Sequence, residues 1–150
     1  MTYFDWAATG VVDENILQEA MHILIEYGAN PSSIHDAGIA AKHKLEEARQ
    51  RCAKALGVSA QTIIFTSGGT ESNCLPIISL LQRQAKGSIL INATEHATVR
   101  EQAYAMERCG WNVIQIPCDN RGIVQPDSVV RLLQDDTALV CVIAVNNETG

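Results

Sequence analysis

The chain has 150 residues and a formal net charge of −6 at pH 7, with 47% hydrophobic and 19% charged residues. This composition is typical of one globular domain, and the acidic balance argues against nucleic acid or an anionic membrane as a partner. No apolar run approaches the roughly 18 residues of a membrane-spanning helix, and the first residues lack the basic region of a signal peptide, so we expect a cytoplasmic protein.

The hydrophobic pattern predicts helices that alternate with strands. Periodic apolar positions predict helices at 13–27, at 36–56, from a glycine turn at 68–69 to about 84, at 95–109 and at 126–134. Short apolar runs predict strands at 62–65, 88–91, 112–116 and 138–145. Because continuous apolar strands between helices indicate a sheet buried on both faces, we predict a three-layer α/β fold with a mostly parallel sheet flanked by helices.

The five cysteines form no CxxC pair and lie inside periodic or apolar segments. We therefore predict free, buried thiols in a reducing compartment. The same spacing predicts neither a disulfide framework nor a metal site.

Polar clusters follow three of the predicted strands, at 67–70, 94–96 and 146–148. Ligands of parallel α/β sheets bind at the carboxyl ends of the strands. We therefore predict that the three clusters meet in one active site.

The first cluster is a glycine turn, Ser67-Gly68-Gly69-Thr70, at the start of a predicted helix. The first N–H groups of a helix have no intrahelical partner, and the helix dipole is positive there. Glycines let the backbone approach a phosphate closely, and the Thr70 hydroxyl adds a donor. No lysine follows the glycines, so the turn is not a nucleotide-binding P-loop. The turn predicts a phosphate or carboxylate site, and the alternative is an ordinary helix start capped by Thr70.

The other two clusters have structural alternatives as well. His96 follows a strand and opens a helix, where its ring suits stacking or proton transfer, but it could equally be a polar residue at a helix start. Asn146, Asn147 and Glu148 follow the most apolar run and could form a plain turn. His35 lies in a predicted loop and is an intermediate case.

Motifs matching one enzyme family run in order through nearly the whole chain. They lie at 3–5, 7–9, 28–33, 35, 38, 45–49, 64–73, 94–96 and 146–150. On these motifs the chain resembles the amino-terminal part of the pyridoxal-phosphate-dependent cysteine desulfurases of the NifS/IscS type, in the class V aminotransferase group. The resemblance implies the front part of the large domain of a fold-type I pyridoxal phosphate (PLP) enzyme.

The resemblance also implies roles for individual residues. Gly69 and Thr70 would hold the phosphate of pyridoxal 5′-phosphate, His96 would stack on the pyridine ring and assist proton transfer, and Asn147 would lie near the ring and the bound amino acid. The substrate pocket would include Ala8, Thr9, Asn30 and His35.

The implied activity takes sulfur from L-cysteine, leaving L-alanine and an enzyme persulfide, for iron–sulfur cluster or thio-cofactor assembly. PLP serves as the electron sink. A homodimer and a sulfur-acceptor protein are the implied partners. We also expect association through the apolar edge at 138–145.

The chain also departs from the family. Trp6, Gly10 and Val11 replace the residues that usually flank its Ala-Ala-Thr motif. The family's cofactor-bearing lysine, the aspartate that pairs with the pyridine nitrogen, the persulfide-forming cysteine and the carboxylate-binding arginine have no counterpart here. We therefore expect residues 1–150 to be part of a large domain, with 1–12 lining the site, and the chain alone to be inactive. The alternatives are a catalytically inactive phosphate-binding or interaction module, or a related lyase such as a selenocysteine lyase.

Overall fold

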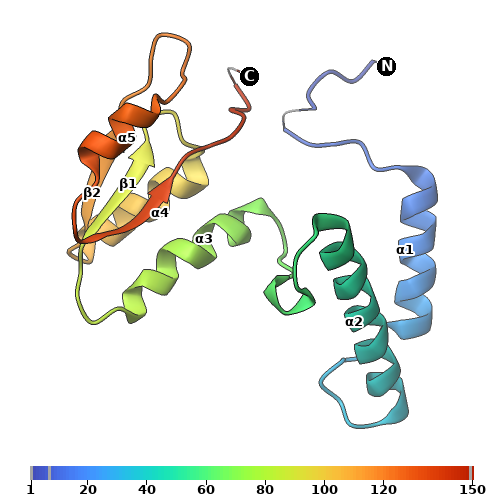
Figure 1. Ribbon diagram of the computed structural model, residues 1–150. Coiled ribbons are helices and arrows are strands. Elements are labelled where there is room, and N and C mark those ends of the chain that lie inside the picture. The colour runs from blue at the N-terminus through green and yellow to red at the C-terminus, as the bar shows by residue number, and fades with distance from the viewer. Residues whose placement is uncertain (1, 7, 149) are drawn as a thin grey trace. The chain divides into compact units, whose positions relative to one another are not determined.

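The computed structural model describes residues 2–6, 8–148 and 150, drawn in Figure 1. The chain divides into two compact units, residues 1–65 and residues 66–150. None of the helices in these described stretches has the length and apolar character needed to cross a bilayer.

The first unit consists mainly of two helices, α1 (Glu14–Tyr27) and α2 (Asp36–Leu56), close to the predicted ranges. The Asp13 carboxylate caps α1 by accepting hydrogen bonds from the backbone N–H groups of Asn15 and Ile16. Gly57 ends α2 in a left-handed conformation with φ 68°, which glycine adopts without steric cost. No residue of α1 is buried, so this unit positions two helices without enclosing a core between them.

The prediction of a strand at 62–65 is wrong. A short 3₁₀ turn, η1 (Ala60–Thr62), is followed by an extended segment that belongs to no sheet in the described part of the chain. The segment is held by Arg49, whose guanidinium donates to the Ile63 carbonyl at 2.5 Å and lies 5.0 Å from the centre of the Phe65 ring. A strand needs a hydrogen-bonding neighbour as well as an apolar sequence, and none of the described strands pairs with this segment.

The second unit contains a parallel sheet of three strands in the order β2-β1-β3. The strands are β1 (Ser88–Asn92), β2 (Asn112–Ile116) and β3 (Thr137–Cys141). Its helices are α3 (Gly69–Ser79), the 3₁₀ turn η2 (Leu80–Gln82), α4 (Ala97–Arg108) and α5 (Pro126–Leu132). The predicted α/β class and parallel sheet are confirmed, although the apolar run at 138–145 is a strand only as far as Cys141.

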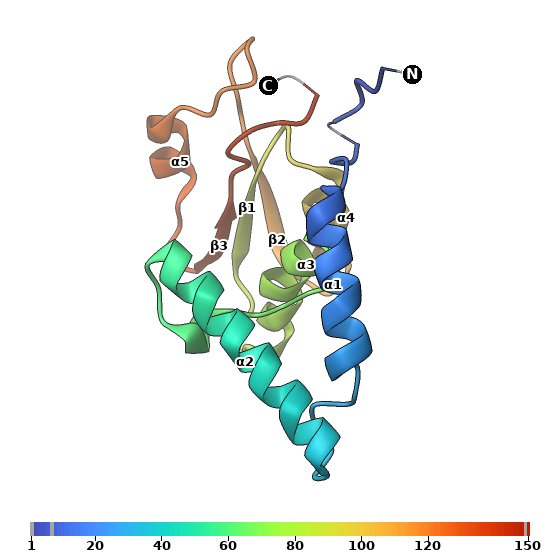
Figure 2. The same cartoon turned by 90° about the vertical axis from the view of Figure 1, so that its right-hand side faces the viewer.

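The sheet lies between helices. Figures 1 and 2 show α4 on one face of the sheet and α5 on the other. Ile89 and Ile91 of β1 pack with Ala103 and Met106 of α4 in the main apolar cluster. Leu90 is fully buried as well, and strand alternation directs it to the opposite face. The central strand is therefore buried on both faces, as a layered α/β unit requires.

The cysteines correct one further prediction. All five are free, as expected, but none is buried: Cys52 and Cys109 are exposed and the other three are partly exposed. Cys52 lies in α2, whose only buried residues are Gly38, Ala41 and Ala53. Its periodic position predicted a helix face without revealing whether anything covers that face.

Candidate active site

The glycine turn opens α3 as predicted and leaves space beside the start of that helix. Gly68 precedes the first residue of α3 and provides no side-chain cap. A Cβ atom added at Gly68 or Gly69 would meet nothing within 4 Å. Open space therefore lies beside both glycines, and the Gly68 position supplies no side-chain acceptor to the first amides of α3.

Hydrogen bonds hold the turn itself in shape. The Glu71 carboxylate accepts from the Ser67 backbone N–H at 2.6 Å and from the Ser67 hydroxyl at 2.7 Å. These two bonds, the backbone bond first, hold the pKa of Glu71 below its ordinary value. The Thr66 hydroxyl donates to the Gly68 carbonyl at 3.2 Å and lies 2.7 Å from the Ser72 hydroxyl. The backbone of the turn is thus fixed before any ligand binds.

His96 lies between the end of β1 and the start of α4, where it acts as the N-cap residue. Its Nδ1 accepts from the Thr98 backbone N–H at 3.2 Å and lies 2.9 Å from the Thr98 hydroxyl. The interpretation of His96 as a polar residue at a helix start is confirmed, because its ring caps α4 through Nδ1. Its role in stacking or proton transfer stays a prediction. The neighbouring Glu95 side chain is buried and accepts from the His96 backbone N–H at 3.2 Å.

The segment after β3 reaches the His96 region. Asn146 donates from Nδ2 to the Thr94 carbonyl at 2.8 Å, and its Oδ1 accepts from the Glu148 backbone N–H at 2.8 Å. A pocket of about 240 Å³ lies there, lined by Thr94, Glu95, His96, Ala97, Arg100, Asn146, Asn147 and Glu148. The predicted convergence of the second and third clusters is confirmed.

The first helical turns of α3 reach the same histidine through a second pocket, of about 450 Å³. Its lining includes Ser72 and Asn73 of α3, Glu95 and His96, and the residues from Leu139 to Ala144. Cys141 is part of this lining, and burial, with the nearby Glu95 carboxylate, raises the pKa of its thiol. Near neutral pH Cys141 therefore stays a thiol rather than a reactive thiolate.

The remaining predicted site residues belong to the first unit. The backbone N–H groups of Ala8 and Thr9 both bond to the Asp5 carbonyl. Asn30 accepts from the Ser32 backbone N–H at 2.9 Å, and His35 caps α2 by accepting from the Gly38 N–H at 3.2 Å. These bonds give the four residues local structural roles, and their place in a substrate pocket stays a prediction.

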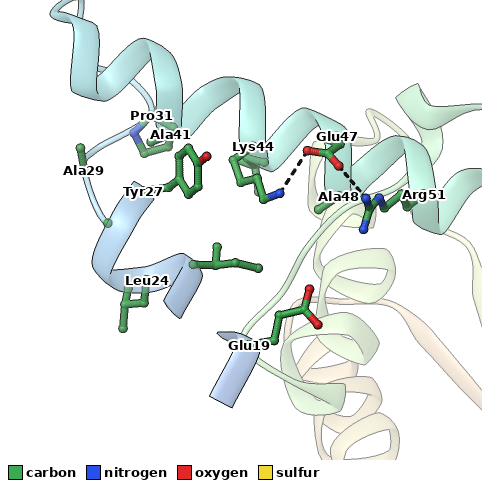
Figure 3. A pocket seen from close by; sticks show the side chains of 13 residues that line it. Glu19, Leu24, Tyr27, Ala29, Pro31, Ala41, Lys44, Glu47, Ala48 and Arg51 are labelled. Atoms are coloured by element: carbon green, nitrogen blue, oxygen red, sulfur yellow. Dashed lines mark hydrogen bonds and ion pairs between the residues drawn. The ribbon is translucent and has the colours of Figure 1, made fainter. Parts of the chain in front are cut away.

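A separate pocket of about 430 Å³ lies between α1 and α2 (Figure 3). It is lined mainly by apolar groups such as Leu24 and the ring of Tyr27. Lys44 and Arg51 at its border both pair with Glu47, at 3.2 and 2.8 Å, and the Lys44 contact is the main cause that lowers the pKa of that carboxyl. The pocket holds none of the predicted site residues, and we interpret it as a packing groove.

Sequence reasoning missed three residues near the site. Thr98 and Asn73 form hydrogen bonds that lead to the His96 ring, and Arg100 lines the smaller pocket. The available signal was the spacing His-x-Thr at a helix start, since a residue two positions after an N-cap places its N–H on the cap. Arg100, one turn after His96 on the same helix, carried the same positional signal.

These residues fit the groups of pyridoxal phosphate. An uncapped helix start, the exposed Thr70 hydroxyl and the space beside Gly68 and Gly69 suit a phosphate. A histidine ring at the border of two pockets suits a flat aromatic ring and a transferable proton. Fold and site together thus define an α/β protein in which a histidine, the segment after β3 and the helix that follows the glycine turn meet at the carboxyl end of a parallel sheet.

Residues 2–150 match the sequence model of the family Aminotransferase class-V, and the chain belongs to this family. It is 38% identical over 150 residues to "Cysteine desulfurase IscS" of Dictyoglomus turgidum, and the aligned region covers 99% of this chain and 38% of that protein. It is also 38% identical to "Cysteine desulfurase IscS 1" of Archaeoglobus fulgidus, over 100% of this chain and 40% of the relative.

Solved structures give the same result. A structure titled "NIFS-LIKE PROTEIN" is 37% identical with a TM-score of 0.88, covering 96% of this chain and 40% of its own. A structure of DndA from Streptomyces lividans is 34% identical with a TM-score of 0.82, covering 99% of this chain and 42% of its own. The chain thus spans about two fifths of the length of these relatives.

Proposed function

We propose that the protein is a PLP-dependent cysteine desulfurase, to which these residues contribute the phosphate site and the ring-stacking histidine. The observation that carries the proposal is the meeting of α3, which starts at the open glycine turn, with His96 and the segment after β3. The names of the relatives in this family point to the same activity.

Each residue would contribute through an interaction that its position allows. The first amides of α3, with the Thr70 hydroxyl, would bind the phosphate. His96 would lie on the cofactor ring, and its Nε2, which takes part in no hydrogen bond among the described residues, would assist proton transfer at the substrate. Asn147, in the smaller pocket with His96, would orient the ring and the bound amino acid.

In the proposed reaction the C–S bond of L-cysteine breaks and its sulfur forms an S–S bond with an enzyme cysteine. The carbon that loses sulfur gains a proton, so the products are L-alanine and an enzyme persulfide. When bound, PLP supplies the electron sink for this cleavage. The raised pKa of Cys141 makes that thiol a poor sulfur acceptor, in keeping with an acceptor cysteine elsewhere.

The test is release of alanine from L-cysteine by the intact protein, with His96→Asn as the variant. Asparagine is a good N-cap, so this change keeps the start of α4 while removing the ring. We expect a loss of about 10²- to 10⁴-fold in kcat, the range for general acid–base catalysis. The exposed His43 of α2 gives the matched control His43→Gln, which should leave kcat unchanged.

Three outcomes would overturn the proposal. Full activity of His96→Asn would remove the proton-transfer role. Alanine release from selenocysteine alone would favour a selenocysteine lyase, and no release from either substrate by the intact protein loaded with PLP would leave a binding module.

We extend the proposal to a homodimer, a sulfur-acceptor partner, iron–sulfur cluster assembly and a cytoplasmic location, as expected for the family.

A further inference from the structure

A line of three side chains leads from α3 to the His96 ring. Asn73 donates from Nδ2 to the Thr98 hydroxyl oxygen at 3.0 Å, and that oxygen lies 2.9 Å from Nδ1 of His96. The three residues come from the second turn of α3 and from the start of α4. Thr98 thus connects the helix that follows the glycine turn to the candidate catalytic histidine.

The directions of these hydrogen bonds follow from one fixed donor. The Thr98 backbone N–H points at Nδ1 of His96 at 3.2 Å, and an amide N–H can only donate. Nδ1 therefore accepts and carries no proton. The Thr98 hydroxyl must then donate its single proton to Nδ1, while its oxygen accepts from Asn73.

We propose that Thr98, itself oriented by Asn73, is a positioning residue that holds the His96 ring in the tautomer with its proton on Nε2. Two donors on Nδ1 oppose both rotation of the ring and movement of the proton to Nδ1, because either change would place two N–H or O–H groups against each other. This inference rests on the proposed function of His96.

The tautomer decides what the neutral ring offers to a ligand. With the proton on Nε2, that atom presents an N–H group and no lone pair, so the neutral ring donates a hydrogen bond there and cannot take up a proton at that atom. With the proton on Nδ1, the same atom would be a base. The hydrogen bonds from Asn73 through Thr98 thus set whether Nε2 of His96 donates or accepts a hydrogen bond.

His35 provides an internal reference. It also caps a helix by accepting a backbone N–H at Nδ1, from Gly38 at 3.2 Å, and its ring has no hydroxyl partner among the described residues. A change at Thr98 should therefore alter the protonation of the His96 ring nitrogens and leave those of His35 unchanged.

The test is nitrogen NMR of the intact protein with ¹⁵N-labelled histidine rings in alkaline buffer without cofactor, with His96→Asn used to assign the signal. We expect one protonated nitrogen, Nε2, and one unprotonated nitrogen, Nδ1. Thr98→Val, which keeps the shape but removes the hydroxyl, should move the two His96 resonances toward each other. Thr98→Ser should restore the separation, and the His35 resonances should stay in place throughout.

Kinetics provide the second readout. Thr98→Val should lower kcat by up to about tenfold, the effect of losing one hydrogen bond, with KM nearly unchanged and Thr98→Ser close to wild type. If Thr98→Val fails to fold, Asn73→Ala replaces it, because an unheld hydroxyl loses its orientation; the His96 resonances should again converge.

The outcomes separate this inference from the proposed function. His96 resonances that keep their separation in Thr98→Val or Asn73→Ala, or a protonated Nδ1 in the wild type, would overturn the positioning role even if desulfuration is observed. Convergent resonances in a protein that releases no alanine would support the tautomer and overturn the desulfurase proposal.

Discussion

The two units of this chain use their apolar residues in opposite ways. In residues 66–150, β1 is completely buried, and Ile89 and Leu90 have no exposed surface. In residues 1–65, the α1 stripe is open to solvent, with Ile25 81% exposed and Leu24 70% exposed. An amphipathic pattern predicts a helix in both units, but only the second unit supplies what covers the apolar face.

The same contrast holds for the two capping histidines. His35 and His96 both accept a backbone N–H at Nδ1. Only His96 also has a side-chain hydroxyl within hydrogen-bonding distance among the bonds of the described residues, and only His96 borders pockets that include the end of a sheet. The comparison shows that a histidine at a helix cap is a candidate catalytic group only where the surrounding packed unit places a pocket beside its ring.

The largest predicted effect concerns the core. Ile89→Ala should reduce the free energy of unfolding by about 2–5 kcal/mol, because it leaves a cavity in a fully buried site. The matched change Ile25→Ala, on the exposed face of α1, should stay within about 0.5 kcal/mol. Urea unfolding of the intact protein compares the two. Equal losses would break the comparison, since they would mean that α1 is as well covered as β1.

A smaller predicted effect concerns two carboxyls, the exposed Glu71 and the partly buried Glu47, whose pKa is lowered. Hydrogen bonds from Ser67 lower the pKa of Glu71, whereas for Glu47 a hydrogen bond from Lys44 is joined by the charges of Lys44 and Arg51. A lowered pKa in the folded state contributes stability above the ordinary value of 4.5, and that stability is lost as the pH falls through the folded value. Both carboxyls therefore stabilise the fold at neutral pH and cease to do so in acid.

Salt should distinguish the two carboxyls. At 1 M salt the Debye length is about 3 Å, so the part of the Glu47 shift that comes from the Lys44 and Arg51 charges should be lost and its pKa should move toward the ordinary value, while the pKa of Glu71 stays low. Side-chain carboxyl NMR titrations at low and high salt measure both in one sample, with Ser67→Ala as the variant that should raise the pKa of Glu71 alone. Equal salt sensitivity would contradict the hydrogen-bonded description of the glycine turn.

Much of the fold follows from local patterns. The apolar runs at 88–91 and 112–116 predicted β1 and β2. These predictions are confirmed because both segments find a hydrogen-bonding neighbour in the sheet. The equally β-like run at 62–65 failed, because pairing depends on a neighbouring strand that no local sequence encodes. The burial of Cys52 was mispredicted for the same reason, since the helical period shows a face but not its cover.

The candidate site divides in a similar way. His96 and Asn147 were predicted to lie together, because polar residues after apolar strands gather at one edge of a parallel sheet, and both line the same pocket. The glycine turn was predictable as the start of α3, but residues 67–70 line neither pocket at this edge. The Asn73–Thr98 bond joins residues on different helices. It depends on how α3 and α4 pack, which the spacing along the chain does not show.

The most direct test of the central claim, that the glycine turn binds the cofactor phosphate, compares the affinities of pyridoxal phosphate and pyridoxal for the intact protein. Wild type should bind the phosphate form more tightly, and Thr70→Ala should reduce that preference about tenfold or more, because a hydrogen bond to a charged group is lost. Affinity for pyridoxal should be unchanged. An unaltered preference in Thr70→Ala, or an equal loss for both ligands, would contradict the account.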